Sequence, residues 1–271
     1  MVSTSTYATI GRAVTRATLA AGGAALLGSV ALGVRPRALP PVPGPRPTLP
    51  TVPVPPGLPA PVERWARVTF GDAVPVVRTA VVTGRGTVRV GRPGRLPLPV
   101  RFRFWQEVGR AYRHDIEVCV AGVRVGRVEE WFADGHGRAR VLGQEVSDNP
   151  RWDQGANLGL WIEALAWFPS VLLTHPAARW EPFDADAAVL VVPFRDGEER
   201  VLVRFDADSA RIRYWEMSRF PNGEGVKELY VNGTWFEDGR PWADFRVDEV
   251  ALDVPVDLDL TSPSVVGPAV G

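Results

Sequence analysis

Glu163 is the residue of this sequence that most needs a chemical explanation. It is the one charge in the stretch Trp161–Leu173, "WIEALAWFPSVLL", which is otherwise almost entirely apolar. A carboxylate among apolar side chains must be solvated, paired or protonated, because burying it without a partner costs several kcal/mol. Three roles remain open: half of a buried ion pair that fixes a helix on a sheet, the polar end of a ligand pocket, or a catalytic acid.

The other residues that could carry chemistry lack the spacing that chemistry requires. The histidines His114, His136 and His175 are not three or four residues apart and do not adjoin a cysteine pair, so we expect no metal site. His114 stands beside Asp115 at a predicted strand start, and we expect an exposed pair there. No G-x-S-x-G sequence marks a serine nucleophile. We therefore expect no cofactor, and a hydrolase that uses Glu163 or His114 is the least favoured hypothesis.

Composition removes further classes of function. The chain has 271 residues, with 31 basic and 31 acidic side chains, so it lacks the net positive charge that a nucleic-acid partner needs. The single cysteine, Cys119, excludes an internal disulfide. This length leaves room for one domain of about 200 residues with accessory segments.

The N-terminus carries an uncharged run, residues 17–34, between arginines on both sides. It is at the lower limit for crossing a membrane, which takes about 20 residues. The sequence Ser29-Val30-Ala31 also fits the small-x-small site of a secretory signal. A cleaved signal peptide and an uncleaved anchor both remain open for residues 1–35. Either predicts a protein at the cell membrane or outside the cytoplasm.

Residues 36–61 are rich in proline, "PRALPPVPGPRPTLPTVPVPPGLPAP". Proline at this density disfavours helix and sheet and favours an extended spacer. We expect a linker that holds the following domain away from a membrane surface.

The domain is predicted to span residues 62–260, followed by a flexible tail at 261–271. A short amphipathic helix in "VERWARVTF" should stop at Gly71. The stretch "LPVRFRFW" alternates arginine with phenylalanine, and turn signals such as Ala121-Gly122 and Asp134-Gly135 recur about every ten residues. This pattern predicts an antiparallel meander with one polar and one apolar face.

A helical period interrupts the strands. Leu158, Trp161, Ile162 and Leu165 form a helical stripe, for which Asn157 is the expected N-cap. Pro169 should kink or end this helix. The run is too short and too interrupted for a membrane span. The predicted fold class is α+β, mainly β: a curved antiparallel sheet wrapped around one or two helices, preceded by an N-terminal apolar helix.

Several aromatic and arginine-containing motifs occur in a suggestive order. They are "ALAWFPSVLL", "RWEPFD", "VLVRFDADSARIRYWEMSRF" and "ELYVNGTWFEDGRPWADFRVDEVALDV". Over roughly Val62 to Asp257 the chain resembles an uncharacterised bacterial family known only as a domain of unknown function. Its second half also resembles the fold of periplasmic lipoprotein carriers and mycobacterial lipid-binding lipoproteins. That resemblance implies a curved sheet that shelters an acyl chain, and the family resemblance, more than spacing, implies Arg219 as the partner of Glu163.

These observations lead to one favoured hypothesis and one main alternative. The favoured hypothesis is an exported or membrane-anchored module that binds an apolar ligand, such as an acyl chain or lipid, in a cavity of the sheet. Its expected ligand-binding residues are Trp161, Glu163, Trp167, Trp215 and Arg219. The alternative is a tethered structural or interaction domain with a filled core and no ligand. A cavity beside the tryptophans would distinguish the two.

Overall fold

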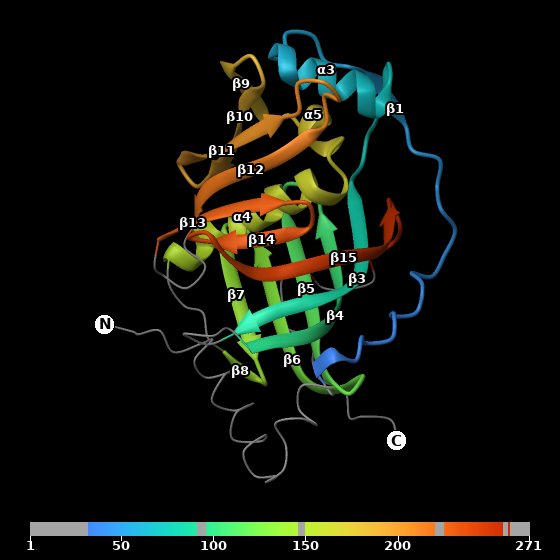
Figure 1. Cartoon of the computed structure of the whole chain (residues 1–271). Coiled ribbons are helices and arrows are strands. Elements are labelled where there is room, and N and C mark those ends of the chain that lie inside the picture. The colour runs from blue at the N-terminus through green and yellow to red at the C-terminus, as the bar shows by residue number, and fades with distance from the viewer. Residues whose placement is uncertain (1–31, 91–95, 146–149, 220–224, 257–259, 261–271) are drawn as a thin grey trace.

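The computed structural model describes residues 32–90, 96–145, 150–219, 225–256 and 260 (Figure 1). Most of the predicted signal or anchor and all of the predicted tail lie outside these residues. Within the described ranges, no helix has the length and apolar character needed to cross a membrane.

The fold is mainly β, built on one large antiparallel sheet. The sheet contains β3 (Thr79–Val90), β4 (Leu96–Glu107), β5 (Ala111–Val120), β6 (Val123–Ala133), β7 (His136–Val141), β8 (Gln144–Glu145), β9 (Arg179–Asp184), β10 (Ala187–Phe194), β11 (Gly197–Phe205), β12 (Ile212–Arg219), β13 (Val226–Val231), β14 (Thr234–Glu237) and β15 (Arg240–Leu252). Their order is β8-β7-β6-β5-β4-β3-β15-β14-β13-β12-β11-β10-β9, so the sheet is open, with edges at β8 and β9.

Two meanders make up this sheet, one from β3 to β8 and one from β9 to β15. The pairing of β15 with β3 joins them. The predicted turns are confirmed: Ala121-Gly122 and Asp134-Gly135 both take positive φ angles at both residues, which suits a tight hairpin turn. In Figure 1, β5 to β7 stand roughly upright while the strands of the second meander cross the page, so the sheet is strongly twisted.

Helices α3 (Ala60–Phe70), α4 (Pro150–Trp167) and α5 (Val171–Thr174) accompany the sheet. The end of α3 at Gly71 is confirmed, with a φ of 67° that favours glycine. The N-cap prediction at Asn157 is wrong, because α4 already begins at Pro150. The Asn157 amide lies inside the helix and donates to the Pro193 carbonyl at 3.0 Å. A tertiary partner therefore satisfies the polar group that the sequence assigned to a cap.

Helix α4 lies between the two meanders. It packs on β6 and β7 of the first and on β10 and β12 of the second. Nearly all of its described side chains are buried, including the polar residues Asp153, Gln154, Asn157 and Glu163. Its end before Pro169 agrees with the sequence prediction. The main core forms where this helix meets the inner faces of both meanders.

The proline-rich segment contacts the domain at several points. Within it, β1 (Thr51–Pro53) pairs with β2 (Ala73–Pro75). Val42 is buried, and its backbone N–H donates to Glu249 Oε2 at 2.9 Å. The carbonyl of Pro40 accepts from Arg103 Nη2 at 2.7 Å. The sequence predicted a spacer here, whereas residues 40–53 lie along the domain.

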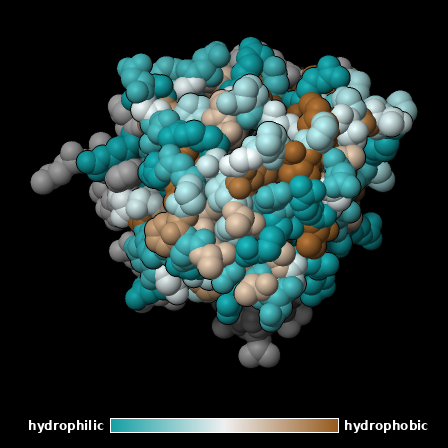
Figure 2. Space-filling model, turned by 90° about the horizontal axis from the view of Figure 1, so that it is seen from above, coloured by the Kyte–Doolittle hydropathy of each residue, from teal (hydrophilic) through white to brown (hydrophobic). Residues whose placement is uncertain are grey.

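Seen from above, the surface is mostly polar. Figure 2 shows hydrophobic side chains in small patches separated by hydrophilic ones. This face carries no broad apolar area of the kind that marks a stable protein interface.

Candidate ligand cavity

A cavity of about 100 Å³ lies between α4 and strands of both meanders. Most of its wall is apolar. The apolar lining residues are Val88, Val90, Leu98, Val100, Phe104, Ile116, Val118, Val128, Ile162, Trp167, Trp235, Trp242 and Phe245. The polar lining residues are His114, Glu130, Glu163 and Arg219.

Strand alternation decides which side chains face the cavity. On β5, His114, Ile116 and Val118 share the inner face, because successive side chains of a strand point to opposite sides. His114 and Val118 lie about 14 Å apart along the strand, at roughly 3.4 Å per residue. The register places Glu130 directly opposite His114. The cavity therefore has a polar end at this pair and an apolar end toward Val118.

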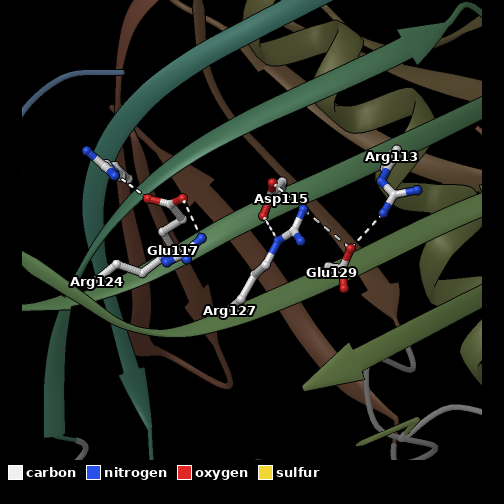
Figure 3. Close-up of polar contacts among 7 residues, drawn as sticks. Arg113, Asp115, Glu117, Arg124, Arg127 and Glu129 are labelled. Carbon is white, nitrogen blue, oxygen red and sulfur yellow. Dashed lines mark hydrogen bonds and ion pairs between the residues drawn. The ribbon is translucent and has the colours of Figure 1, made fainter. Parts of the chain in front are cut away.

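The outer face of the same strands carries a ladder of opposite charges (Figure 3). Asp115 binds Arg127 through two hydrogen bonds of 2.6 and 2.7 Å. Arg113 donates to Glu129 at 2.7 Å, and Glu117 lies 3.4 Å from Arg124. A shift of one residue in strand register would point these charged side chains toward the inner face of the sheet. The ladder therefore favours the register in which Ile116 and Val128 point inward.

The Glu163 carboxylate reaches the polar end of the cavity from α4. Its Oε2 atom accepts hydrogen bonds from Gln106 Nε2 at 2.7 Å and from His114 Nε2 at 2.9 Å. Glu163 is 8% exposed and His114 is 5% exposed. These two contacts fix the helix on β4 and β5 and hold the carboxylate at the cavity wall.

The His114 ring packs against two aromatic rings. Its centroid lies 3.9 Å from that of Phe104, with the rings tilted, and it stacks on Tyr112 at 4.1 Å. Its Nδ1 atom lies 4.0 Å from Glu130 Oε2. The Tyr112 hydroxyl donates to Glu130. Burial raises the pKa of the Tyr112 hydroxyl, and the charges of Glu130 and Glu163 raise it further, so this group stays a proton donor at neutral pH.

Arg219 enters the polar end from β12. Its Nε atom donates to the Gly155 carbonyl at 2.8 Å, and Nη1 lies 3.3 Å from both oxygens of Glu228. Burial acts to lower the pKa of this guanidinium, but neighbouring acidic groups, Glu228 foremost, hold it above its ordinary value. Burial raises the pKa of Glu228 to about 7, although Arg219 opposes that rise.

A glycine in α4 leaves room for this arginine. A Cβ atom at Gly159 would lie 3.2 Å from Arg219 Nη2 and 3.6 Å from the Tyr112 hydroxyl oxygen. Any larger side chain would therefore have to displace the guanidinium.

The structure brings three of the five predicted site residues to the cavity. Glu163, Trp167 and Arg219 line it, whereas the other two predicted residues pack elsewhere. Trp161 is buried in the core with its ring against His175. Trp215 stacks on Tyr230 at 4.0 Å.

The expected pairing of Glu163 with Arg219 is not the contact that forms. Glu163 binds Gln106 and His114, and Arg219 binds Glu228. His114 was predicted to be exposed, and that prediction is wrong, because it is buried. His114 lies inside β5, two residues before Ile116 and four before Val118, so all three side chains point to the same face. That phase was the signal that could have placed it inside.

The polar end of the cavity offers two carboxylates, an imidazole and a guanidinium, and the rest of its wall is apolar. Its described lining contains no serine, threonine, cysteine or lysine. The described part of the chain holds no group of three or more side chains suited to a metal ion. The arrangement can surround an apolar group and offer hydrogen-bonding partners to its polar end.

Residues 50–247 match the model of a family described as "Family of unknown function (DUF6544)". No curated protein matches the chain in sequence. Two solved structures are similar to it with a TM-score of 0.37 each. One is a putative outer membrane lipoprotein-sorting protein domain from Vibrio parahaemolyticus, with 10% identity over 66% of this chain and 87% of that one. The other is a DUF1329 family protein from Desulfovibrio piger, with 13% identity over 73% of this chain and 93% of that one. Similarity this distant carries no conclusion about function.

Proposed function

Because this chain belongs to the family of unknown function DUF6544, its role has to come from its own residues, and we propose that it binds an apolar ligand in the cavity beside α4. The ligand is an acyl chain or another lipid-like group. The observation that supports this proposal is the cavity itself, whose wall combines aliphatic and aromatic side chains with one polar end.

The size of the cavity bounds what it holds. An engineered apolar cavity of about 150 Å³ binds benzene. At about 100 Å³, this cavity accepts a somewhat smaller group, such as the head and first carbons of a chain. A longer chain would extend beyond the described cavity or require side chains of its wall to move.

The cellular place of this activity is part of the proposal. Residues 1–35 act as a secretory signal or a membrane anchor, and the domain works outside the cytoplasm or at the membrane. The support is the uncharged run at residues 17–34 with arginines on both sides.

The alternative that the sequence left open is an interaction domain with a filled core. The cavity disfavours it, because a module that only bridges partners gains nothing from an unfilled apolar space in its core. The mostly polar face in Figure 2 offers no broad apolar surface in its favour.

Blocking the cavity tests the proposal. Val128 lines it from β6, whereas Val125 on the same strand is exposed, so Val128→Phe fills the cavity and Val125→Phe is a matched control. The full chain, purified without detergent, is measured by native mass spectrometry and by tryptophan fluorescence during titration with octyl compounds.

We expect a bound mass or a saturable fluorescence change for the wild type and for Val125→Phe, and its loss in Val128→Phe at unchanged melting temperature. Wild-type protein that binds none of these compounds and carries no extractable ligand would overturn the proposal.

A further inference from the structure

We infer that the ligand presents a hydrogen-bond donor, such as an alcohol, an amide or an amine, to the polar end of the cavity, and that carboxylate and phosphate heads are disfavoured. This inference rests on the proposed function and specifies the class of ligand that the site accepts. Two observations support it: two carboxylate oxygens at the cavity accept no hydrogen bond from a described residue, and the charges around them do not sum to a positive value.

Open acceptor oxygens face the cavity. Both hydrogen bonds to Glu163 reach its Oε2 atom, and no described residue donates to its Oε1. On Glu130, Tyr112 donates to Oε1, while Oε2 has only His114 Nδ1 at 4.0 Å, too far for a hydrogen bond. Both carboxylates line the cavity, so a ligand group that enters the polar end meets oxygens that need donors.

With both carboxylates ionised, the charged side chains at the polar end cannot sum to a net positive charge. Glu130 and Glu163 each bring a negative charge, and His114 brings at most one positive charge. Arg219 brings a second, which Glu228 offsets when it is ionised. Even with Glu228 protonated, Arg219 and a protonated His114 only balance the two carboxylates. In every other protonation state with both carboxylates ionised, the polar end is net negative.

An anionic head would therefore enter a site with no spare positive charge. Two carboxylates would repel it in surroundings where charges are weakly screened. Arg219 adds no spare charge when Glu228 is ionised, because its Nη1 lies 3.3 Å from both oxygens of that carboxylate, while its Nε donates to the Gly155 carbonyl. A hydroxyl or an ammonium group instead supplies the donors that Glu163 Oε1 and Glu130 Oε2 lack.

A series of octyl compounds with different heads tests this directly. The wild-type full chain is titrated with 1-octanol, octylamine and octanoate at pH 7.5, with binding followed by calorimetry and tryptophan fluorescence. The three share one apolar chain, so their ranking reports the head alone. We expect octanol and octylamine to bind at least about tenfold more tightly than octanoate.

The variant Glu163→Gln adds a second test. It keeps the shape of the side chain and removes its charge, so we expect the preference for octylamine over octanoate to shrink by about tenfold. Glu107 is a half-buried glutamate on β4 that does not line the cavity, so Glu107→Gln should leave the ranking unchanged.

Each result has one meaning. Octanoate as the tightest ligand, or equal affinities for all three, would overturn this inference while leaving the proposed apolar site intact. Binding of none of the three would overturn the proposed function itself.

Discussion

The carboxylate of Glu163 on α4 and the imidazole of His114 on β5 lie 2.9 Å apart, although 49 residues separate them in the chain. This contact joins the central helix to the first meander at the polar end of the cavity. It makes one carboxylate serve two purposes, since Oε2 fixes the helix and Oε1 stays open to the cavity.

Replacing Glu163 by alanine separates these two purposes. In Glu163→Ala, Gln106 and His114 lose their shared acceptor, so we expect the free energy of unfolding to fall by about 1 kcal/mol. Affinity for 1-octanol should fall more than about tenfold, or by more than about 1.4 kcal/mol. Urea denaturation and calorimetric titration measure the two quantities. Equal losses in both would assign Glu163 a purely structural role.

Glu228 gives the protein a pH dependence of known sign. Its pKa is about 7 in the folded protein against an ordinary value of 4.5, chiefly because it is fully buried. The folded state therefore binds this proton more tightly than the unfolded chain does, and stability declines as pH rises from about 4.5 to about 7. In Glu228→Gln that decline, on the order of a few kcal/mol at most, should disappear.

Urea denaturation at intervals between pH 4.5 and 8 checks this slope. Glu216→Gln, on neighbouring β12 and partly exposed, should keep it. A wild type and a Glu228→Gln variant with parallel pH profiles would show that Glu228 is ionised throughout.

Gly137 allows β7 to approach α4 closely. A Cβ atom there would lie 2.5 Å from Ala156 Cβ and 2.9 Å from Trp152 Cδ1. We expect Gly137→Ala to lower the free energy of unfolding by about 1–3 kcal/mol, because the helix must shift to admit the methyl group. Gly197→Ala is the matched control, since its nearest contact would be an ordinary 3.7 Å. Similar melting temperatures for both variants would contradict the close approach.

Glu249 holds the proline-rich segment on the domain. It accepts the Val42 N–H and pairs with Arg46, and the Val42 hydrogen bond is the main cause that lowers the pKa of Glu249. We expect Glu249→Ala to speed hydrogen exchange at Val42 and trypsin cleavage after Arg37. A lowered pKa contributes stability that is lost as pH falls, so acid should release the segment in the wild type as well.

The exposed glutamate Glu145 offers the comparison, because Glu145→Ala should leave both rates unchanged. Unaltered exchange at Val42 in Glu249→Ala would mean that the segment is held by its other contacts.

The sequence by itself determined the local structure. Alternation in "LPVRFRFW" placed Phe102 and Phe104 on the buried face, because a strand has a period of two. Gly71 and Pro169 marked the ends of helices, since both act on the backbone of their own segment. The apolar character of Trp161–Leu173 identified a buried helix for the same local reason.

What only the tertiary structure decided was which polar groups meet. The partner of Glu163 depends on how α4 sits between two meanders, and on a strand register that the outer charge ladder helps to specify. Strand phase could have placed His114 on the inner face, but side chains 49 residues apart leave no periodic mark on the sequence, so its pairing with Glu163 could not be predicted from spacing. The cavity exists because α4 and the sheet leave a space between them, and no single segment encodes that space.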